Sequence, residues 1–200
     1  MLVLCSTASH RAALLARLGL PFETAAPDFD ETGCESLPPA DMALAYAEGK
    51  ARSLAAGYPG RAALLLAADQ VTAVEGEILR KARTAAECEA QLARLAGRTH
   101  TLDAALFALD VDSGRTASAV VRVSLQMRAL SAAQIARYVA ADRPLGSAGG
   151  YTYEGLGVAL FESVRFEGDA GGDDSAIVGL PLGATLRLLG QFGLDPLGPR

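Results

Sequence analysis

The sequence predicts an α/β fold in which a mixed, twisted sheet is flanked by helices. Segments with helical spacing alternate with short apolar runs along the chain, which is typical of a sheet covered by helices. The central strand candidates form hairpins, and hairpins place antiparallel strands in the sheet. Two hundred residues with no repeat and no long linker indicate one domain over residues 1–200, and a division into two lobes stays open.

The N-terminal half begins with a short apolar strand at 2–5. A helix follows, which Ser9 can cap and which ends near Leu18, before Gly19. The other elements of this half are a strand at 22–26, an acidic loop at 28–31, a helix at 39–56 that carries Lys50, and an apolar strand at 62–68. That last strand runs directly into Asp69 and Gln70.

The C-terminal half is marked by turn and cap signals. Glu75-Gly76 separates strands at 71–74 and 77–79 as a two-residue hairpin turn. Thr84–Glu87 and Ser131–Gln134 are capping boxes, so helices should run from them to about Leu95 and to the residue before Arg143. The remaining elements are strands at 99–110 and 116–127, a glycine-dense loop at 146–157, a strand at 158–161, an acidic glycine-rich loop at 167–174, and a helix from near Pro181 to Gly193.

Charge and cysteine content exclude several classes of protein. Eighteen basic and 23 acidic side chains give a net charge of −5 without a block of like charges, which argues against non-specific binding of nucleic acid. No apolar run approaches the roughly 20 residues that a membrane-spanning helix needs. Cys5, Cys34 and Cys88 form no C-x-x-C pair, which disfavours a disulfide framework and favours reduced thiols in the cytoplasm.

Lysine is rare in this chain, with only Lys50 and Lys81 beside 16 arginines. A GC-rich genome explains such a bias, because it favours arginine codons over lysine codons. A lysine that persists under that bias can mark a position where a compact ammonium is needed instead of a planar guanidinium.

Several polar residues are candidates for chemistry, and each has a structural alternative. The P-loop motif is missing, and Gly155-Leu156-Gly157 does not complete a dinucleotide-binding motif. Asp69 should emerge where a buried strand reaches the surface, as a metal-binding or catalytic carboxylate or as a turn cap. Glu31 lies in an acidic loop that could equally be a solvated turn. Residues 6–9, at the start of a helix, can bind a phosphate or simply cap the helix.

Taken together, these segments resemble the Maf family of nucleoside triphosphate pyrophosphatases along nearly the whole chain. The matching motifs are Ser6-Thr7-Ala8-Ser9-His10-Arg11, Asp30-Glu31, Lys50, Asp69, Lys81, Gly97-Arg98-Thr99-His100, and Asp173 followed by Ile177-Val178-Gly179-Leu180-Pro181. The two lysines that composition singles out therefore match two motif positions of the family.

Within the family, the chain is most similar to the branch that hydrolyses 7-methyl-GTP. The features typical of that branch are Phe22-Glu23-Thr24-Ala25-Ala26-Pro27, Asp69-Gln70, and Glu154 where the dTTP/UTP branch has glutamine. The departures from the family pattern are Ala8, Ser9 and Ala12 in the first turn, Arg80 and Ala82 beside Lys81, and His10 where this branch often has tryptophan.

The resemblance implies a Maf/ITPase-like fold and hydrolysis of a nucleoside triphosphate to the monophosphate and pyrophosphate, as a house-cleaning reaction of the nucleotide pool. It implies the following roles: Asp69 as proton acceptor, Glu31 and Asp69 as ligands of a divalent cation (Mg²⁺ or Mn²⁺), Lys50, Lys81, Arg11 and Ser6 as phosphate contacts, and His10, Gln70 and Glu154 in base selection. Asp173 is a further motif residue without an assigned role.

Two other functions stay open at this stage. One is a pyrophosphatase specific for dTTP and UTP, and the other is a nucleotide-binding regulator of cell division that does not turn its ligand over. The residues leave a monomer and a homodimer equally open.

Overall fold

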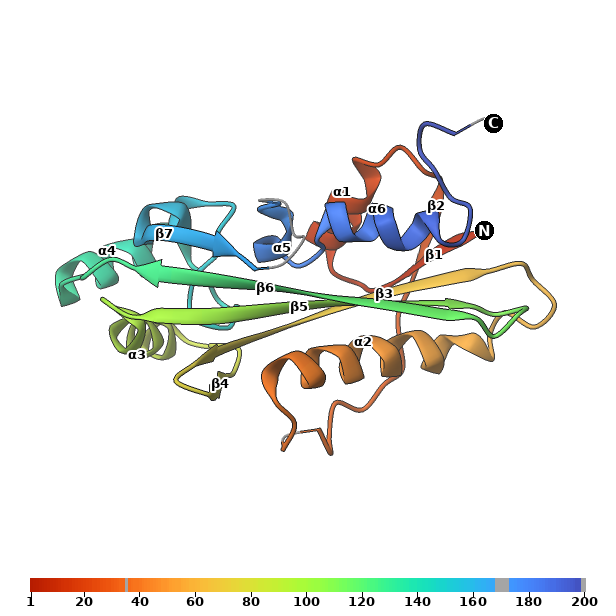
Figure 1. Ribbon diagram of the computed structural model, residues 1–200. Helices are drawn as coiled ribbons and strands as arrows, with labels where there is room; N and C mark the ends of the chain where they lie inside the picture. Colours follow the sequence, from red (N-terminus) through yellow and green to blue (C-terminus); the bar gives the residue numbers. More distant parts are fainter. Residues whose placement is uncertain (35, 168–172, 199–200) are drawn as a thin grey trace.

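A mixed sheet of seven strands organises the computed structural model, which describes residues 1–34, 36–167 and 173–198 (Figure 1). The strands are β1 (Leu2–Cys5), β2 (Phe22–Ala25), β3 (Leu64–Val74), β4 (Glu77–Leu79), β5 (Thr99–Asp110), β6 (Thr116–Met127) and β7 (Phe161–Phe166). Their order is β2-β1-β3-β5-β6-β7, and β4 pairs with the far end of β3. Strand β1 is parallel to both neighbours, and the other pairs are antiparallel.

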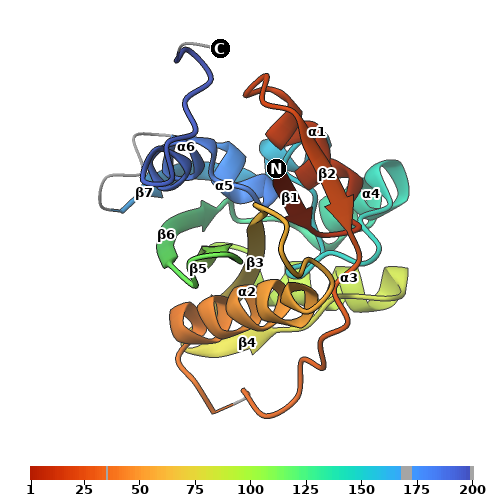
Figure 2. The ribbon, with the colours of Figure 1, turned by 90° about the vertical axis from the view of Figure 1, so that its right-hand side faces the viewer.

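Helices cover both faces of this sheet. They are α1 (Ser9–Ala16), α2 (Pro39–Ala55), α3 (Ala85–Leu95), α4 (Ala132–Asp142), the 3₁₀ helix η1 (Leu156–Leu160), α5 (Ser175–Val178) and α6 (Leu182–Gly190). Alternate residues of β3 point to opposite faces of the sheet. Leu66 packs with α1, α5 and α6 on one face, and Leu65 packs against α2 on the other (Figure 2). A third apolar cluster joins α3 and α4 at one end of the β5–β6 hairpin (Figure 1). The predicted α/β sheet flanked by helices is therefore confirmed.

Strand β3 differs from its predicted bounds in a way that matters for the site. The sequence pattern ends this strand at residue 68, but the strand continues unbroken to Val74. The reason is the antiparallel pairing with β5, which runs along β3 from Leu64 to Ala73. Asp69 therefore lies within a strand, 9 % exposed, and not at its end. The pairing that ends before Asp69 is the parallel one with β1, which stops at Leu66.

The short-range signals in the central part of the chain are confirmed. Glu75 and Gly76 have φ angles of 52° and 81°, as a tight hairpin turn requires. Ser131 and Gln134 cap α4 reciprocally through side chain and backbone. Thr84 also caps α3, but the Glu87 carboxylate accepts the backbone N–H of Arg83 at 2.6 Å and does not close the box.

Three other predictions need correction. Ser9 does not cap α1, because it is already helical and Ala8 occupies the cap position. The strand predicted at 158–161 is instead helix η1, and β7 begins only at Phe161. The last helix, α6, begins at Leu182 beside Pro181 as predicted, but it ends at Gly190 and not at Gly193; the short helix α5 that precedes it was not predicted. Residues 168–172 of the predicted loop at 167–174 lie outside the described residues.

None of the helices in the described ranges combines the length and the apolar character needed to cross a membrane. The three cysteines are free, and Cys5 and Cys88 are buried. Burial raises the pKa of the Cys5 thiol to about 12, so this thiol stays protonated and unreactive at neutral pH.

Candidate active site

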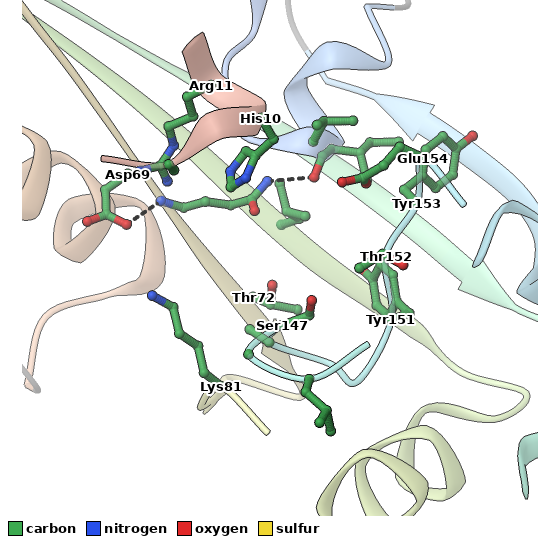
Figure 3. A pocket seen from close by; sticks show the side chains of 18 of the residues that line it. His10, Arg11, Asp69, Thr72, Lys81, Ser147, Tyr151, Thr152, Tyr153 and Glu154 are labelled. Atoms are coloured by element: carbon green, nitrogen blue, oxygen red, sulfur yellow. Dashed lines mark hydrogen bonds between the residues drawn. The ribbon is translucent and has the colours of Figure 1, made fainter. Parts of the chain in front are cut away.

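A cavity lies where β3 continues past the end of β1. Strand β1 pairs with β3 only as far as Leu66, and β4 pairs with it only from Thr72. Within the described chain, residues 67–71 therefore have no strand partner on this edge of β3. A cavity of about 340 Å³ is lined by this part of β3, by the start of α1 and by the segment that follows β4 (Figure 3).

The cavity gathers most of the residues predicted from the sequence. Those that line it are His10, Arg11, Lys50, Asp69, Gln70, Lys81 and Glu154. In Figure 3, Asp69 and the Lys81 ammonium lie toward one end, and Tyr153 and Glu154 lie toward the other. We call these the phosphate end and the base end, for the charges and rings that each contains.

At the phosphate end, the Lys50 ammonium lies between two carboxylates. Its Nζ is 2.7 Å from Oε1 of Glu31 and also donates a hydrogen bond to Oδ2 of Asp69. The side chains of Lys50 and Asp69 are only 14 % and 12 % exposed, whereas that of Glu31 is half exposed. Because the two carboxylates contact one ammonium, they converge on a single point, beside the cavity that Lys50 and Asp69 line.

Glu31 reaches this point because its loop packs against α2. A Cβ at position 49 would lie 2.2 Å from the Phe29 ring, so only glycine at Gly49 lets that ring lie against the helix. Tyr46, one turn earlier, donates its hydroxyl hydrogen to the carbonyl oxygen of Glu31 at 2.9 Å. The segment around Gly49 and Lys50 thus both supplies the ammonium and holds the acidic loop next to it.

Asp69 and Gln70 point to opposite faces of the sheet, as neighbours in a strand must. Oδ1 of Asp69 accepts the backbone N–H of Gln70 at 2.6 Å, which orients the carboxylate. The side-chain amide of Gln70 donates to the carbonyl oxygens of Ala176 and Ile177 in α5, each at 2.9 Å. Gln70 therefore ties β3 to α5, and its part in base selection stays a prediction.

Arg11 and His10 stand next to each other at the start of α1. Arg11 Nε donates to the carbonyl oxygen of Gly179 at 3.2 Å, which holds the guanidinium at the cavity wall. Burial lowers the pKa of Arg11, and the charges of Asp69 and Glu31 oppose this shift. Burial and the Arg11 charge lower the pKa of His10 against the opposing charge of Glu154, so His10 is neutral at pH 7.

Lys81 is positioned by contacts that the sequence did not indicate. Its backbone forms an isolated antiparallel bridge with Ala148 of the glycine-dense loop. The amide of Gln91, on α3, joins the same two segments: it donates to the carbonyl oxygen of Arg80 and accepts from Gly149 N–H, both at 2.7 Å. A glutamine on an amphipathic helix carries no signal for this contact, because it depends on two distant segments that meet only in the fold.

The loop that carries Glu154 is fastened by a second residue that sequence reasoning missed. Asp142, at the end of α4, accepts hydrogen bonds from the hydroxyls of Thr152 at 2.7 Å and Tyr138 at 2.8 Å. Its other oxygen accepts the backbone N–H of Leu156 at 3.3 Å. These contacts lie on both sides of Glu154, so Asp142 holds the backbone segment that carries this exposed residue.

His100 lies beneath the same loop. It is 1 % exposed, and its Nε2 is 2.9 Å from the hydroxyl oxygen of Tyr151, which lines the cavity. In the described part of the chain, its Nδ1 has no hydrogen-bond partner. Burial lowers the pKa of His100 to about 4, so the ring is neutral at physiological pH.

Ser6, Glu31 and Asp173 do not line the cavity, and Glu31 reaches it only through its contact with Lys50. The buried Ser6 hydroxyl accepts the backbone N–H of Ala8 at 3.1 Å and shapes the turn into α1. Asp173 accepts the backbone N–H of Ser175 at 3.1 Å and that of Gly183 at 2.6 Å. It therefore joins the starts of α5 and α6 behind the cavity wall.

A second cavity of about 550 Å³ adjoins the base end. It shares His10, Tyr153 and Glu154 with the first cavity and extends to Arg17 of α1 and to Asp174. The two cavities together form one site that runs from a cluster of cations and carboxylates to a region with two rings and a carboxylate.

A family model described as Maf-like protein matches residues 1–192. The chain belongs to the Maf family. It is 39 % identical over 196 residues to a protein named 7-methyl-GTP pyrophosphatase from Bordetella pertussis, covering 98 % of this chain and 94 % of that protein. Proteins of the same name from Aromatoleum aromaticum (41 % over 193 residues, 96 % of each chain) and Vibrio vulnificus (36 % over 197 residues, 98 % and 97 %) are similar.

Among solved structures, a nucleoside-triphosphatase / dITP/XTP pyrophosphatase from Mycobacterium abscessus matches part of this Maf protein. The TM-score is 0.41 and the sequence identity 19 %, over 63 % of this chain and 72 % of that one. The membership predicted from the ordered motifs is confirmed by the family match and by the three curated relatives.

The donors at the phosphate end of this Maf protein suit a hard divalent cation that is shared with a ligand. No group of three or more His, Cys, Asp or Glu side chains in residues 1–34, 36–167 and 173–198 could hold a metal ion alone. Glu31 and Asp69 offer two carboxylates that converge on one point. Mg²⁺ is commonly bound by one or two carboxylates together with substrate phosphates and water, so this donor set fits such an ion.

Proposed function

We propose that this protein hydrolyses 7-methyl-GTP to 7-methyl-GMP and pyrophosphate. The observation that carries the proposal is that one cavity is lined by three cations (Arg11, Lys50 and Lys81), by the buried Asp69 carboxylate and, toward its other end, by the Glu154 carboxylate (Figure 3). The three relatives named 7-methyl-GTP pyrophosphatase, each similar over nearly the full length, support the choice of substrate.

At the phosphate end, the cations Arg11, Lys50 and Lys81 neutralise the triphosphate, which carries most of the substrate's charge. Asp69 accepts a proton from water as the water oxygen forms a bond to the α phosphorus. The bond from that phosphorus to the bridging oxygen breaks, and the bond pair leaves with pyrophosphate. The hydrogen bond from Gln70 N–H keeps the Asp69 carboxylate oriented during the reaction.

The proposal includes Mg²⁺ or Mn²⁺, which Glu31 and Asp69 would hold. When bound, this ion would supply concentrated positive charge beside the reacting phosphate. Because the described residues offer two carboxylates at this point, phosphate oxygens would supply further ligands.

At the base end, Glu154 selects guanine, because its carboxylate accepts both N–H donors of the guanine Watson–Crick edge. Uracil and thymine present carbonyl oxygens there, which a carboxylate repels. Methylation at N7 gives the base a positive charge, which favours stacking on an aromatic ring. Tyr153 and the neutral ring of His10 line this part of the site, and neither repels a cation.

A substrate panel tests this function. Pyrophosphate release is measured for 7-methyl-GTP, GTP, dTTP and UTP, each with Mg²⁺, Mn²⁺ or EDTA. We expect the highest kcat/KM with 7-methyl-GTP and loss of activity in EDTA. Higher kcat/KM with dTTP or UTP would assign the protein to the pyrimidine branch. Nucleotide binding without any pyrophosphate release would leave the non-hydrolysing regulator as the function.

The reaction belongs in the cytoplasm, where free nucleotides and reduced thiols coexist. The three free cysteines agree with that location.

A further inference from the structure

Lys50 occupies the point at which Glu31 and Asp69 converge. We infer that the Lys50 ammonium and the divalent cation compete for this position, so that the nucleotide-free protein binds the metal weakly and the metal binds together with the nucleotide. This inference rests on the proposed function, because it assigns the order in which the two components of that reaction occupy the site.

Three groups hold the ammonium in place. Oε1 of Glu31 lies 2.7 Å from Nζ, and Oδ2 of Asp69 accepts a hydrogen bond from it. The ring of Tyr46 lies below it, with its centroid 6.0 Å from Nζ, within the range of a cation–π contact. A divalent cation that binds both carboxylates must displace Nζ, because both would occupy the same few ångströms.

The local charge also disfavours a metal ion without a nucleotide. Two carboxylates and one ammonium leave a net charge of −1, which attracts a divalent cation less strongly than two free carboxylates would. The Arg11 guanidinium lies close enough to sense the charges of both Asp69 and Glu31, so it repels an added cation as well. A triphosphate changes this balance, because its oxygens attract Lys50 and Arg11 away from the carboxylates and offer further ligands to the metal.

Lys81 provides a matched control within the same cavity. It is the only other lysine of the chain and lines the same cavity. Among the described residues, it makes no ion pair with Glu31 or Asp69. Neutralising Lys81 removes the same charge from the cavity but leaves the position between the carboxylates filled.

The experiment measures Mn²⁺ binding to nucleotide-free protein by titration calorimetry, for the wild type, Lys50→Met and Lys81→Met. We expect Lys50→Met to bind Mn²⁺ about tenfold more tightly than the wild type, since a charged hydrogen-bonded pair no longer opposes the metal. Lys81→Met should tighten Mn²⁺ binding much less than Lys50→Met, because among the described residues Lys81 forms no ion pair with Glu31 or Asp69 and does not occupy the position between them. In the wild type, a non-hydrolysable α,β-methylene nucleotide should tighten Mn²⁺ binding, and Mn²⁺ should tighten nucleotide binding by the same factor.

Unchanged or weaker Mn²⁺ binding by Lys50→Met would overturn the inference. Equal tightening by Lys81→Met would also overturn it, because general repulsion would then explain the effect. Circular dichroism checks the fold of each variant, and Lys50→Gln replaces the methionine variant if that one does not fold. Pyrophosphate release by the wild type is measured separately. If the wild type is inactive but Lys50→Met gains metal affinity, only the proposed function is wrong. If the wild type is active but Lys50→Met gains no metal affinity, only this inference is wrong.

Discussion

At the phosphate end of the site, Lys50 and Asp69 stand on regular elements, whereas at the base end Tyr153 and Glu154 stand on an irregular loop. Lys50 and Asp69 belong to α2 and β3, and their backbones are held by helix and sheet hydrogen bonds. Tyr153 and Glu154 belong to the glycine-dense loop between α4 and η1. That loop is held by the side chains of single residues, Gln91 and Asp142.

In the proposed reaction, this difference separates the residues that cleave the triphosphate from those that select the base. Cleavage of a phosphoanhydride needs charges at constant positions, and a backbone with many cooperative hydrogen bonds supplies them. Base selection needs a surface that can change without loss of the sheet, and a loop held by a few side chains allows this. The four predictions below test this division, beginning with the phosphate end.

Asp69→Asn should lower kcat for 7-methyl-GTP by about 100-fold or more, because an amide of the same size neither accepts the proton nor binds a cation as well. The measurement is steady-state pyrophosphate release, with the melting temperature as the check on folding. More than about a tenth of the wild-type rate in a well-folded variant would remove Asp69 from its role as the base. The division between the two ends would then lose its strongest support.

The free energy of unfolding should depend on pH through His100, which lies beneath the loop of the base end. Its pKa is about 4 in the folded protein and about 6.5 when unfolded, so the unfolded chain takes up a proton first as the pH falls. This contribution to stability is fully present above about pH 6.5 and is lost toward pH 4. The free energy of unfolding should therefore fall by about 2 kcal/mol between pH 7 and pH 5 from this group.

Urea unfolding at the two pH values measures this effect, and His100→Gln serves as the control. The variant should show a smaller change between pH 7 and pH 5, because its amide does not titrate. Equal changes in the wild type and the variant would mean that other groups cause the pH dependence.

Glu154→Gln should lower kcat/KM for 7-methyl-GTP and raise it for UTP, so that their ratio shifts about tenfold. Glutamine offers one acceptor and one donor, which suit uracil better than guanine. Assays with equal Mn²⁺ compare the two substrates in each protein. A ratio that stays at the wild-type value would show that the carboxylate does not read the base.

The smallest effect is expected for Asp142→Ala, which removes the acceptor that holds the loop on both sides of Glu154. KM for 7-methyl-GTP should rise about threefold with kcat nearly constant, since in the proposed reaction the loop binds the base and takes no part in cleavage. Glu162→Gln, an exposed position on β7, is the matched control. A loss confined to kcat would place the loop in the chemistry and contradict the division.

Local signals predicted much of the fold. The turn at Glu75-Gly76 and the box at Ser131 depend on adjacent residues, so they could be predicted from the sequence alone. The true length of β3 could not, because it depends on pairing with β5, some 35 residues later in the chain. The same holds for the site. Motif order predicted seven residues that line the cavity, but Gln91 and Asp142 act through contacts that exist only after distant loops meet.

The open edge of β3 between β1 and β4 has a consequence for the behaviour of the protein in a crowded solution. Free strand edges invite strands of other molecules to pair with them, and this is a common beginning of aggregation. Here Arg11 and Lys81 line the opening, and the Asp69 carboxylate accepts a hydrogen bond from the backbone N–H of Gln70. The charged groups that suit a phosphate therefore also hinder pairing of this open strand edge with other molecules. Substitutions that neutralise them should lower the solubility of the protein as well as its activity.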